Sequence, residues 1–258
     1  MSLKDLPLQL IQALNDETQS QIDVTHPSVK QWINNKVEVK RIKNSRLGYQ
    51  TDDITCLCFA SKCSDVRTVL RLVHAGADVT VADSHGHTPL ILACRSDVDA
   101  KKKAWYLLQC DASLLSVSDV INGWTPLIFA ASAGNTDCVR MLIHEFGASP
   151  NDADKLGFTC LHQAARYGNM ATVKLLTSYP QCDIDRKNKY GETAADFAKY
   201  GQRRENADFL TALSQQRKHG ASPQPASAAA EAVAAVTSTM TECSVTDDKK
   251  SYGRQMCQ

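Results

Sequence analysis

Apolar residues recur along the middle of the chain at a spacing that predicts short amphipathic helices in pairs. One helix of the clearest pair carries Leu127, Ala130 and Ala131 on one face, and the other carries Val139, Leu142 and Ile143. The following pair repeats the pattern with Leu161, Ala164, Val173 and Leu176. Alanine at such positions lets two helices approach closely, because its side chain is small. The pattern favours an all-α fold built from packed helical hairpins.

Residues that form turns and start helices stand just before the first helix of each pair. Threonine precedes proline at Thr88-Pro89 and at Thr125-Pro126. The hydroxyl can cap free backbone N–H groups, and proline at the first helical position loses no hydrogen bond. Gly86 and Gly123 stand two residues before these threonines, and glycine allows the positive φ that a tight turn requires. We expect a tight turn ahead of each helix pair.

These signals return at a nearly constant period. Four segments align, namely GHTPLILACRS from Gly86, GWTPLIFAASAGN from Gly123, GFTCLHQAARYGN from Gly157 and GETAADFAKYGQ from Gly191. A fifth, DITCLCFASKCS, starts at Asp53, where aspartate replaces the glycine. The five starts are 33, 37, 34 and 34 residues apart. Such a period indicates stacked helical repeats, because no single unit can bury its apolar face alone.

The repeated segments resemble the ankyrin repeat, whose signature is T-P-L-H-x-A at a period of about 33 residues. The matching positions are Thr88-Pro89-Leu90, Thr125-Pro126-Leu127 and Thr159-Cys160-Leu161-His162, and the G-A-D segment appears as Gly76-Ala77-Asp78 and Gly147-Ala148-Ser149. The resemblance covers residues 53–215. It implies a solenoid of five helix-turn-helix units with β-hairpin-like tips. It also implies that His162 is a framework residue that bonds the turn of its own repeat.

Composition divides the chain into three regions. Residues 1–52 lack the repeat and are predicted to form a helical cap, with residues 3–14 as a short amphipathic helix. Residues 53–215 are the repeat domain, with units starting near 53, 86, 123, 157 and 191. Residues 216–258 have few large apolar side chains and are predicted to be a disordered tail. The basic segment 36–46 is interpreted either as a nuclear-import signal or, preferably, as a strand or loop packed on the cap.

The second repeat is longer than the others, and residues 96–103 are expected to lengthen the turn between its two helices. The run Lys101-Lys102-Lys103 is interpreted as a solvated helix start. The alternative is a protruding segment with a functional role. On this view, deletion of residues 97–101 leaves the melting temperature nearly unchanged.

Charge and cysteine content narrow the class of protein. The formal net charge is +1, so no long-range field attracts nucleic acid or an anionic membrane. A secretory signal needs an uninterrupted apolar run, and Asp5 and Pro7 interrupt the first apolar stretch of this chain. No segment reaches the roughly 18 apolar residues that span a bilayer. The ten cysteines are therefore expected to be reduced thiols. We expect a monomeric cytoplasmic protein, with the nucleus as a second location.

Motifs that would indicate an enzyme are missing from the sequence. It contains no phosphate-binding loop, no H-E-x-x-H, no G-x-S-x-G and no C-x-x-C pair. His85 and His87 stand near Asp83, but we expect them on an exposed, mobile tip that lacks a fixed ligand geometry. The sequence therefore predicts no catalytic residue, no metal and no cofactor.

The resemblance implies that a partner protein binds the concave face made by the hairpin tips and the first helices. Counting from each repeat glycine gives the candidate residues His85, His87, Arg95, Trp124, Leu156, Phe158, Arg166, Tyr167, Tyr190 and Tyr200. Trp, Tyr and Arg dominate the energetics of protein interfaces. The alternative is that Trp124 and Phe158 fold back and pack between hairpins, where they would only stabilise the stack.

The predicted function is that of a scaffold or adaptor that binds another protein, with no direct contact to nucleic acid or membrane. Two alternatives remain: a nuclear transcription or signalling cofactor that binds a DNA-binding protein, and a targeting subunit of a larger enzyme complex. Asn151 stands six residues before Gly157, where the resemblance implies a candidate site of asparagine hydroxylation. A plain turn-forming asparagine is the other interpretation.

Overall fold

The computed structural model describes residues 54–218 of the chain, and those residues form helices joined by turns. The elements are α3 (Cys56–Cys63), α4 (Val66–His74), α5 (Pro89–Cys94), α6 (Ala100–Cys110), the 3-10 helix η1 (Ala112–Ser116), α7 (Pro126–Ala133), α8 (Thr136–His144), α9 (Cys160–Arg166), α10 (Met170–Ser178), α11 (Ala194–Tyr200) and α12 (Arg204–Lys218). No β-strand occurs among the described residues. The predicted all-α class is confirmed.

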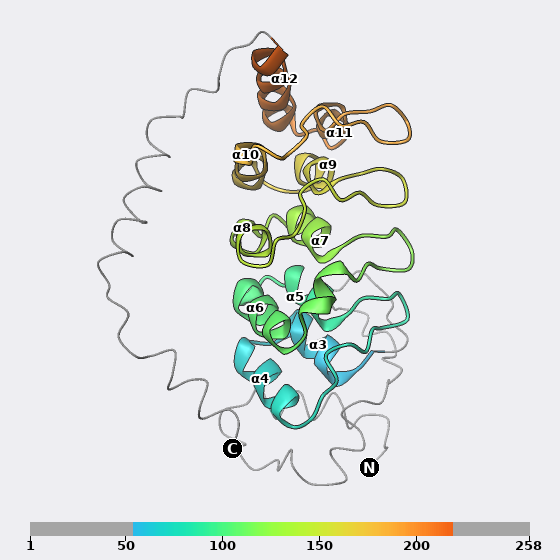
Figure 1. Cartoon of the computed structure of the whole chain (residues 1–258), viewed down its shortest axis with the longest axis vertical. Helices are drawn as coiled ribbons and strands as arrows, with labels where there is room; N and C mark the ends of the chain where they lie inside the picture. Colours follow the sequence, from blue (N-terminus) through green and yellow to red (C-terminus); the bar gives the residue numbers. More distant parts are fainter. Residues whose placement is uncertain (1–53, 219–258) are drawn as a thin grey trace, which may run out of the picture. The chain divides into compact units, whose positions relative to one another are not determined.

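The helices pair and then stack. Within the repeats, α3 packs on α4, α5 on α6, α7 on α8 and α9 on α10. Between repeats, α3, α5, α7, α9 and α11 contact one another in sequence and form one layer, while α4, α6, α8 and α10 form a second layer (Figure 1). Figure 1 also shows the loops before α5, α7, α9 and α11 as finger-like hairpins that project from the first layer. This is the predicted ankyrin-type solenoid.

The chain divides after Ala212, within α12, and the packing described below is that of residues 54–212. Residues 1–53 and 219–258 lie outside the described residues, so the predicted N-terminal cap, the basic segment and most of the predicted tail lie there as well. The boundaries at residues 52 and 215 stay predictions.

Threonine caps start the first helix of the repeats. The hydroxyl oxygen of Thr88 accepts the N–H of Ile91 at 3.3 Å, and that of Thr125 accepts the N–H of Ile128 at 3.4 Å. Pro89 and Pro126 then occupy the first helical position. Each cap satisfies a donor that the helix leaves free and contributes on the order of 1 kcal/mol.

Gly86 and Gly157, before the first helices of repeats two and four, serve both the turn and the stacking. Gly86 has φ +80° and Gly157 has φ +85°. A Cβ on Gly86 would lie 2.9 Å from the backbone nitrogen of Val120, and one on Gly157 would lie 3.2 Å from the Cα of Asn188. Any larger residue would therefore strain the turn and push away the next hairpin.

The long second repeat differs from the prediction, because part of its insert is buried. Lys103 is 0% exposed, and its ammonium donates to the carbonyl of Ser64 at 2.9 Å and to Ser96 Oγ at 2.7 Å. Lys101 and Lys102 are exposed, so the solvated interpretation holds for these two residues and is wrong for Lys103. The amide of Asn135 in the third repeat donates to the carbonyl of Ser96 at 3.1 Å. Deletion of residues 97–101 would shift these anchors, so we now expect it to lower the melting temperature.

Candidate protein-binding surface

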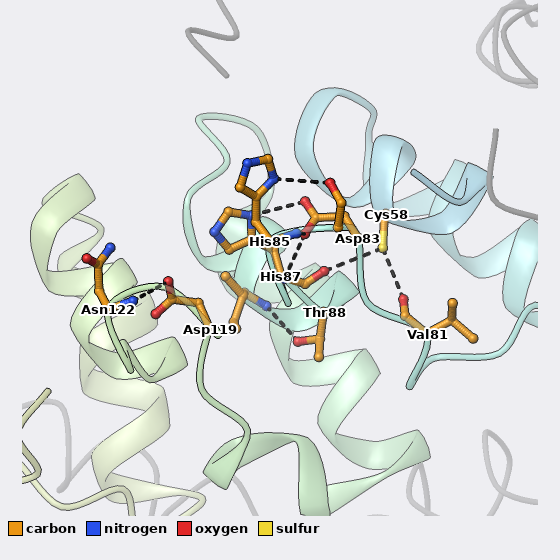
Figure 2. A network of polar contacts seen from close by, with 10 residues as sticks. Cys58, Val81, Asp83, His85, His87, Thr88, Asp119 and Asn122 are labelled. Atoms are coloured by element: carbon orange, nitrogen blue, oxygen red, sulfur yellow. Dashed lines mark hydrogen bonds and ion pairs between the residues drawn. The ribbon is translucent and has the colours of Figure 1, made fainter. Parts of the chain in front are cut away.

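The hairpin tips share one framework, which is an acidic or amide side chain that accepts two backbone N–H groups. Oδ1 of Asp83 accepts the N–H of His85 at 2.9 Å and that of His87 at 2.8 Å (Figure 2). The equivalent oxygen of Asp154 accepts from Leu156 and Phe158, and that of Asn188 accepts from Tyr190 and Glu192. The framework fixes the backbone on both sides of the repeat glycine, at the positions that the sequence analysis selected.

Backbone hydrogen bonds also join each tip to the next. The carbonyl of His85 accepts the N–H of Val120 at 3.1 Å. In the same way, the carbonyl of Asn122 accepts from Lys155 at 3.0 Å, and that of Leu156 accepts from Lys189 at 2.9 Å. Side chains at equivalent tip positions are thus held in a fixed register from repeat to repeat.

Residues just before the glycine face solvent. Leu156 is 42% exposed and Tyr190 is 66% exposed, while His85 is half-buried. The third tip is one residue longer than the second, fourth and fifth, and it exposes Val120 at 62% and Ile121 at 57%. A row of apolar side chains therefore lies along the tips of repeats three to five.

Residues just after the glycine are packed instead, which corrects part of the sequence analysis. His87 and Phe158 are buried, and Trp124 is half-buried with its indole N–H donating to Asp154 Oδ2 at 3.0 Å. The ring of Phe158 lies 4.6 Å from that of Phe197 in the next repeat. Because the tip framework fixes their backbone, these side chains point along the stack. Phe158 therefore packs between hairpins, which was the alternative interpretation, and so does the indole edge of Trp124.

Residues nine positions after the glycine lie at the end of the first helix. Arg95 and Arg166 are half-buried, and Tyr200 is 62% exposed. Tyr167, the neighbour of Arg166, is 49% exposed. The Arg166 guanidinium lies 4.9 Å from the Tyr167 ring centroid. These four residues remain accessible to a partner.

Comparison with known proteins agrees with this geometry. A sequence family described as ankyrin repeats in three copies matches residues 104–188. Ankyrin repeat domain-containing protein 37 of Bos taurus is 36% identical over 124 residues, which cover 48% of this chain and 75% of that protein. The protein of the same name from Homo sapiens is 33% identical over 136 residues, which cover 53% of this chain and 82% of that protein.

This chain belongs to the ankyrin-repeat family. Ankyrin repeats are generally protein interaction modules, and the family is generally non-enzymatic. Other relatives are much longer: ankyrin repeat protein nuc-2 of Neurospora crassa is 34% identical over 155 residues, which cover 58% of this chain and 14% of that protein. Among the described residues, no helix has the length and apolar character that a membrane crossing would need.

Asp83, His85 and His87 form the one group of three potential metal ligands found among residues 54–218, with ligand atoms within 4.8 Å of one another. Asp83 and His87 are buried, so the expectation of a mobile tip was wrong for these two residues. Oδ1 of Asp83 already accepts two N–H groups, and its Oδ2 lies 3.0 Å from His87 Nδ1 (Figure 2). The ankyrin tip framework thus accounts for the cluster, and the prediction of no metal stands as a prediction.

His162 occupies the histidine position of the ankyrin signature and acts as framework. Its Nδ1 lies 3.0 Å from Thr159 Oγ1 and accepts the N–H of Thr159, which closes a capping box at the start of α9. Its Nε2 lies 3.3 Å from the carbonyl oxygen of Glu192 in the next repeat. Burial lowers the pKa of His162, since a charged ring would lose its hydration.

Asn151, the candidate hydroxylation site, lies between two ankyrin repeats. Its amide nitrogen donates to the carbonyl of Gln181 at 2.6 Å, and its oxygen accepts the N–H of Asp183 at 2.9 Å. These two bonds tie the Asn151 side chain to the next repeat. Hydroxylation stays a prediction, and intact-mass measurement after exposure to an asparagine hydroxylase tests it by the gain of one oxygen atom.

Three accessible residues in this region were not predicted from the sequence, namely Lys62, Val120 and Ile121. Counting nine positions from Asp53 leads to Lys62, but the candidate residues were counted only from repeat glycines, and the first repeat has none. For Val120 and Ile121 the sequence did carry a signal, because the third tip has one more residue between Asp119 and Gly123 than the equivalent segments of the other tips.

Proposed function

We propose that the chain is a non-enzymatic scaffold or adaptor that binds another protein through its tip surface. The tip surface consists of Arg95, Val120, Ile121, Leu156, Arg166, Tyr167, Tyr190 and Tyr200. The observation that carries the proposal is where the exposed apolar side chains lie. Within the described residues, six of the eight large apolar side chains that are exposed belong to this surface. A cluster of exposed apolar side chains on a protein surface marks an interaction site.

Two buried rings connect two exposed tyrosines of the tip surface. The ring of Tyr190 lies 6.3 Å from Phe158, which lies 4.6 Å from Phe197. Phe197 in turn lies 6.4 Å from Tyr200. The two exposed tyrosines are thus supported by buried rings, which restrict their motion. A rigid aromatic anchor loses less entropy on binding than a mobile side chain does.

The wider parts of the proposal rest on the sequence. A monomeric chain that binds neither nucleic acid nor membrane directly follows from its near-zero net charge and lack of long apolar segments. We place it in the cytoplasm, with the nucleus as a second location, because its ten cysteines suit a reducing compartment. A nuclear cofactor or a targeting subunit would use the same surface, and the identity of the partner distinguishes these roles.

An affinity pulldown with quantitative mass spectrometry tests the proposal. The variant Tyr167→Ala, Tyr190→Ala, Tyr200→Ala removes three exposed rings from the tip surface. The matched control is Trp105→Ala, which removes a 43% exposed ring from α6 in the other helix layer. We expect the triple variant to lose the partners that wild type and control both recover, with little change in melting temperature. Equal recovery by all three proteins would contradict the proposal.

A further inference from the structure

Two buried thiols meet at the junction of repeats two and three. Cys94 is the last residue of α5, and Cys138 lies in the first turn of α8. The Cys138 thiol donates to the sulfur of Cys94, and the two Sγ atoms are 3.7 Å apart. Both side chains are 0% exposed. Two sulfurs from different repeats and different helix layers are thus in contact (Figure 1).

A second interaction holds the same two segments together. The side-chain amide of Asn135, the N-cap of α8, donates to the carbonyl of Cys94 at 2.7 Å and to that of Ser96 at 3.1 Å. The start of α8 cannot move away from the end of α5 without losing both hydrogen bonds. The two thiols therefore stay neighbours as long as repeats two and three are stacked.

A hollow lies beside one of the two thiols. Its volume is about 520 Å³, and its lining includes Asp97 and Asp99 of the long turn together with Gly134, Asn135 and Cys138 of the third repeat. A small oxidant can enter a hollow of this size. Because Cys138 is 0% exposed, the oxidant then reaches its sulfur only through a movement of the long turn.

The long turn has the features of a segment that opens at moderate cost. Asp99 has φ +47°, a left-handed conformation that is unfavourable for a residue other than glycine, and its side chain does not cap the helix that follows. Val98 is 48% exposed, and Asp97 is exposed as well. Segments with few buried contacts and local strain open more easily than the core around them.

We propose that Cys94 and Cys138 form an oxidation site, at which a hydroperoxide creates a disulfide that locks repeat two to repeat three. The site is independent of the tip surface, since both sulfurs are buried between the repeats. A disulfide there would join residues that are 44 positions apart in the sequence. It would therefore constrain the unfolded chain and stabilise the stacked form.

Cys138 is the thiol that reacts first. It lines the hollow, whereas Cys94 is not among the lining residues. The hydrogen bond from Cys138, together with burial, raises the pKa of the Cys94 thiol well above its ordinary value. Since the thiolate is the reactive form, Cys94 is the poorer first nucleophile. Cys94 instead resolves the oxidised form of Cys138.

The reaction has two balanced steps. The Cys138 sulfur attacks one oxygen of hydrogen peroxide, the O–O bond breaks, and the departing hydroxide leaves as water with the thiol proton, so that Cys138 becomes a sulfenic acid. The Cys94 sulfur then attacks the Cys138 sulfur, the S–O bond breaks, and the hydroxyl group leaves as water with the Cys94 proton. Both thiols are oxidised, and the peroxide is reduced to two waters. To form the bond, the sulfurs must approach by about another 1.7 Å, because an S–S bond is about 2.0 Å long.

Peroxide treatment of the full chain, followed by intact mass and peptide mapping, tests the site. The background variant carries serine at the exposed cysteines and at those outside the described residues, namely Cys63, Cys110, Cys243 and Cys257. We expect this monomer to lose two hydrogen atoms and to yield one peptide pair linked through Cys94 and Cys138. The absence of this link, or links among the other buried cysteines alone, would overturn the proposal.

Single variants in the same background test the order of the two steps. With Cys94→Ala the sulfenic acid has no resolving thiol, so dimedone should trap it on Cys138. With Cys138→Ala no dimedone adduct should form on Cys94. Adducts on Cys94 in the second variant and none on Cys138 in the first would contradict the assigned roles.

A comparison with Cys160 distinguishes local opening from global unfolding. Cys160 is 1% exposed and does not line the hollow. Methyl methanethiosulfonate, a small thiol reagent, should modify Cys138 at least about ten-fold faster than Cys160, because only the long turn has to open. Equal rates would mean that only unfolded protein reacts, and they would refute an oxidation site in the folded stack.

Urea denaturation then measures whether the disulfide locks the junction. The midpoint of the peroxide-treated background variant should rise and should return to its starting value after reduction with a phosphine. The Cys94→Ala variant should show no such rise. A midpoint that falls on oxidation would show that the disulfide does not fit the packing of these repeats, which would overturn the proposal.

Discussion

The ammonium of Lys103 lies 2.9 Å from the carbonyl oxygen of Ser64, although the two residues belong to neighbouring repeats. Ser64 is the C-cap of α3, and Lys103 lies in α6. The same ammonium donates to Ser96 Oγ, so one buried cation joins the end of the first helix of repeat one to the long turn of repeat two. This contact therefore links the two repeats through a buried side chain.

Truncation of Lys103 should therefore be costly, in contrast to truncation of its neighbour. We expect Lys103→Ala to lower the free energy of unfolding by about 2–4 kcal/mol, because it leaves a cavity and buried acceptors without donors. Lys101→Ala should change it by less than about 0.5 kcal/mol, since that side chain is exposed. Urea denaturation measures both values, and equal effects would show that Lys103 is not an anchor.

Lys103 should also give stability an unusual dependence on pH. Burial lowers its pKa from 10.5 to about 8, against the opposing effect of Asp99, Cys63, Asp65 and Asp97. Between these two pH values the unfolded chain binds more protons at this lysine than the fold does, so this contribution to stability rises with pH. The free energy of unfolding of wild type minus that of Lys103→Met should increase between pH 8 and pH 10.5. A difference that is constant or falls would contradict the lowered pKa.

The helix pairs, the caps and the repeat glycines could be predicted from sequence because they depend on local signals. Thr88, Pro89 and Gly86 act within one turn of the chain, and a threonine recurs at the equivalent position of all five repeats. The burial of Lys103 could not be predicted in this way. Lys101, Lys102 and Lys103 have the same composition, and only the helical phase of α6 sends the third of them inward.

Counting along the repeats predicted register but not side-chain direction. The count placed Leu156 and Phe158 in one candidate surface, yet the first is exposed and the second is buried. The Asp154 side chain decides this, because it fixes the backbone at both residues. The contact between Arg95 and Phe129 could not be predicted from the sequence either, because it joins residues of different repeats.

Phe158 should prove to be a stability residue. We expect Phe158→Ala to lower the free energy of unfolding by about 3–5 kcal/mol, because it opens a cavity beside Phe197. Trp124→Ala should cost less, since the indole is half-buried. Circular dichroism during urea denaturation compares the two variants. If Phe158→Ala proved as stable as wild type, the packing of this ring between repeats would be refuted.

His162 should make the fold sensitive to acid. Burial lowers its pKa in the fold below the ordinary value of 6.5, so the unfolded chain takes up a proton first as the pH falls. The contribution of His162 to the free energy of unfolding is fully present above pH 6.5 and declines below that pH. His162→Gln keeps a residue suited to the capping box but cannot titrate in this range. Wild type should therefore lose more stability than the variant between pH 7 and pH 5, and parallel loss in both proteins would argue against a lowered pKa.

Site-specific photocrosslinking tests most directly whether a partner protein binds the tip surface. A benzophenone amino acid is placed at Leu156, at Tyr190 and, as a control in the other helix layer, at Trp105. We expect irradiation in cell extract to link the same protein to positions 156 and 190, and position 105 to give no such adduct. Adducts formed at position 105 and at neither tip position would contradict it.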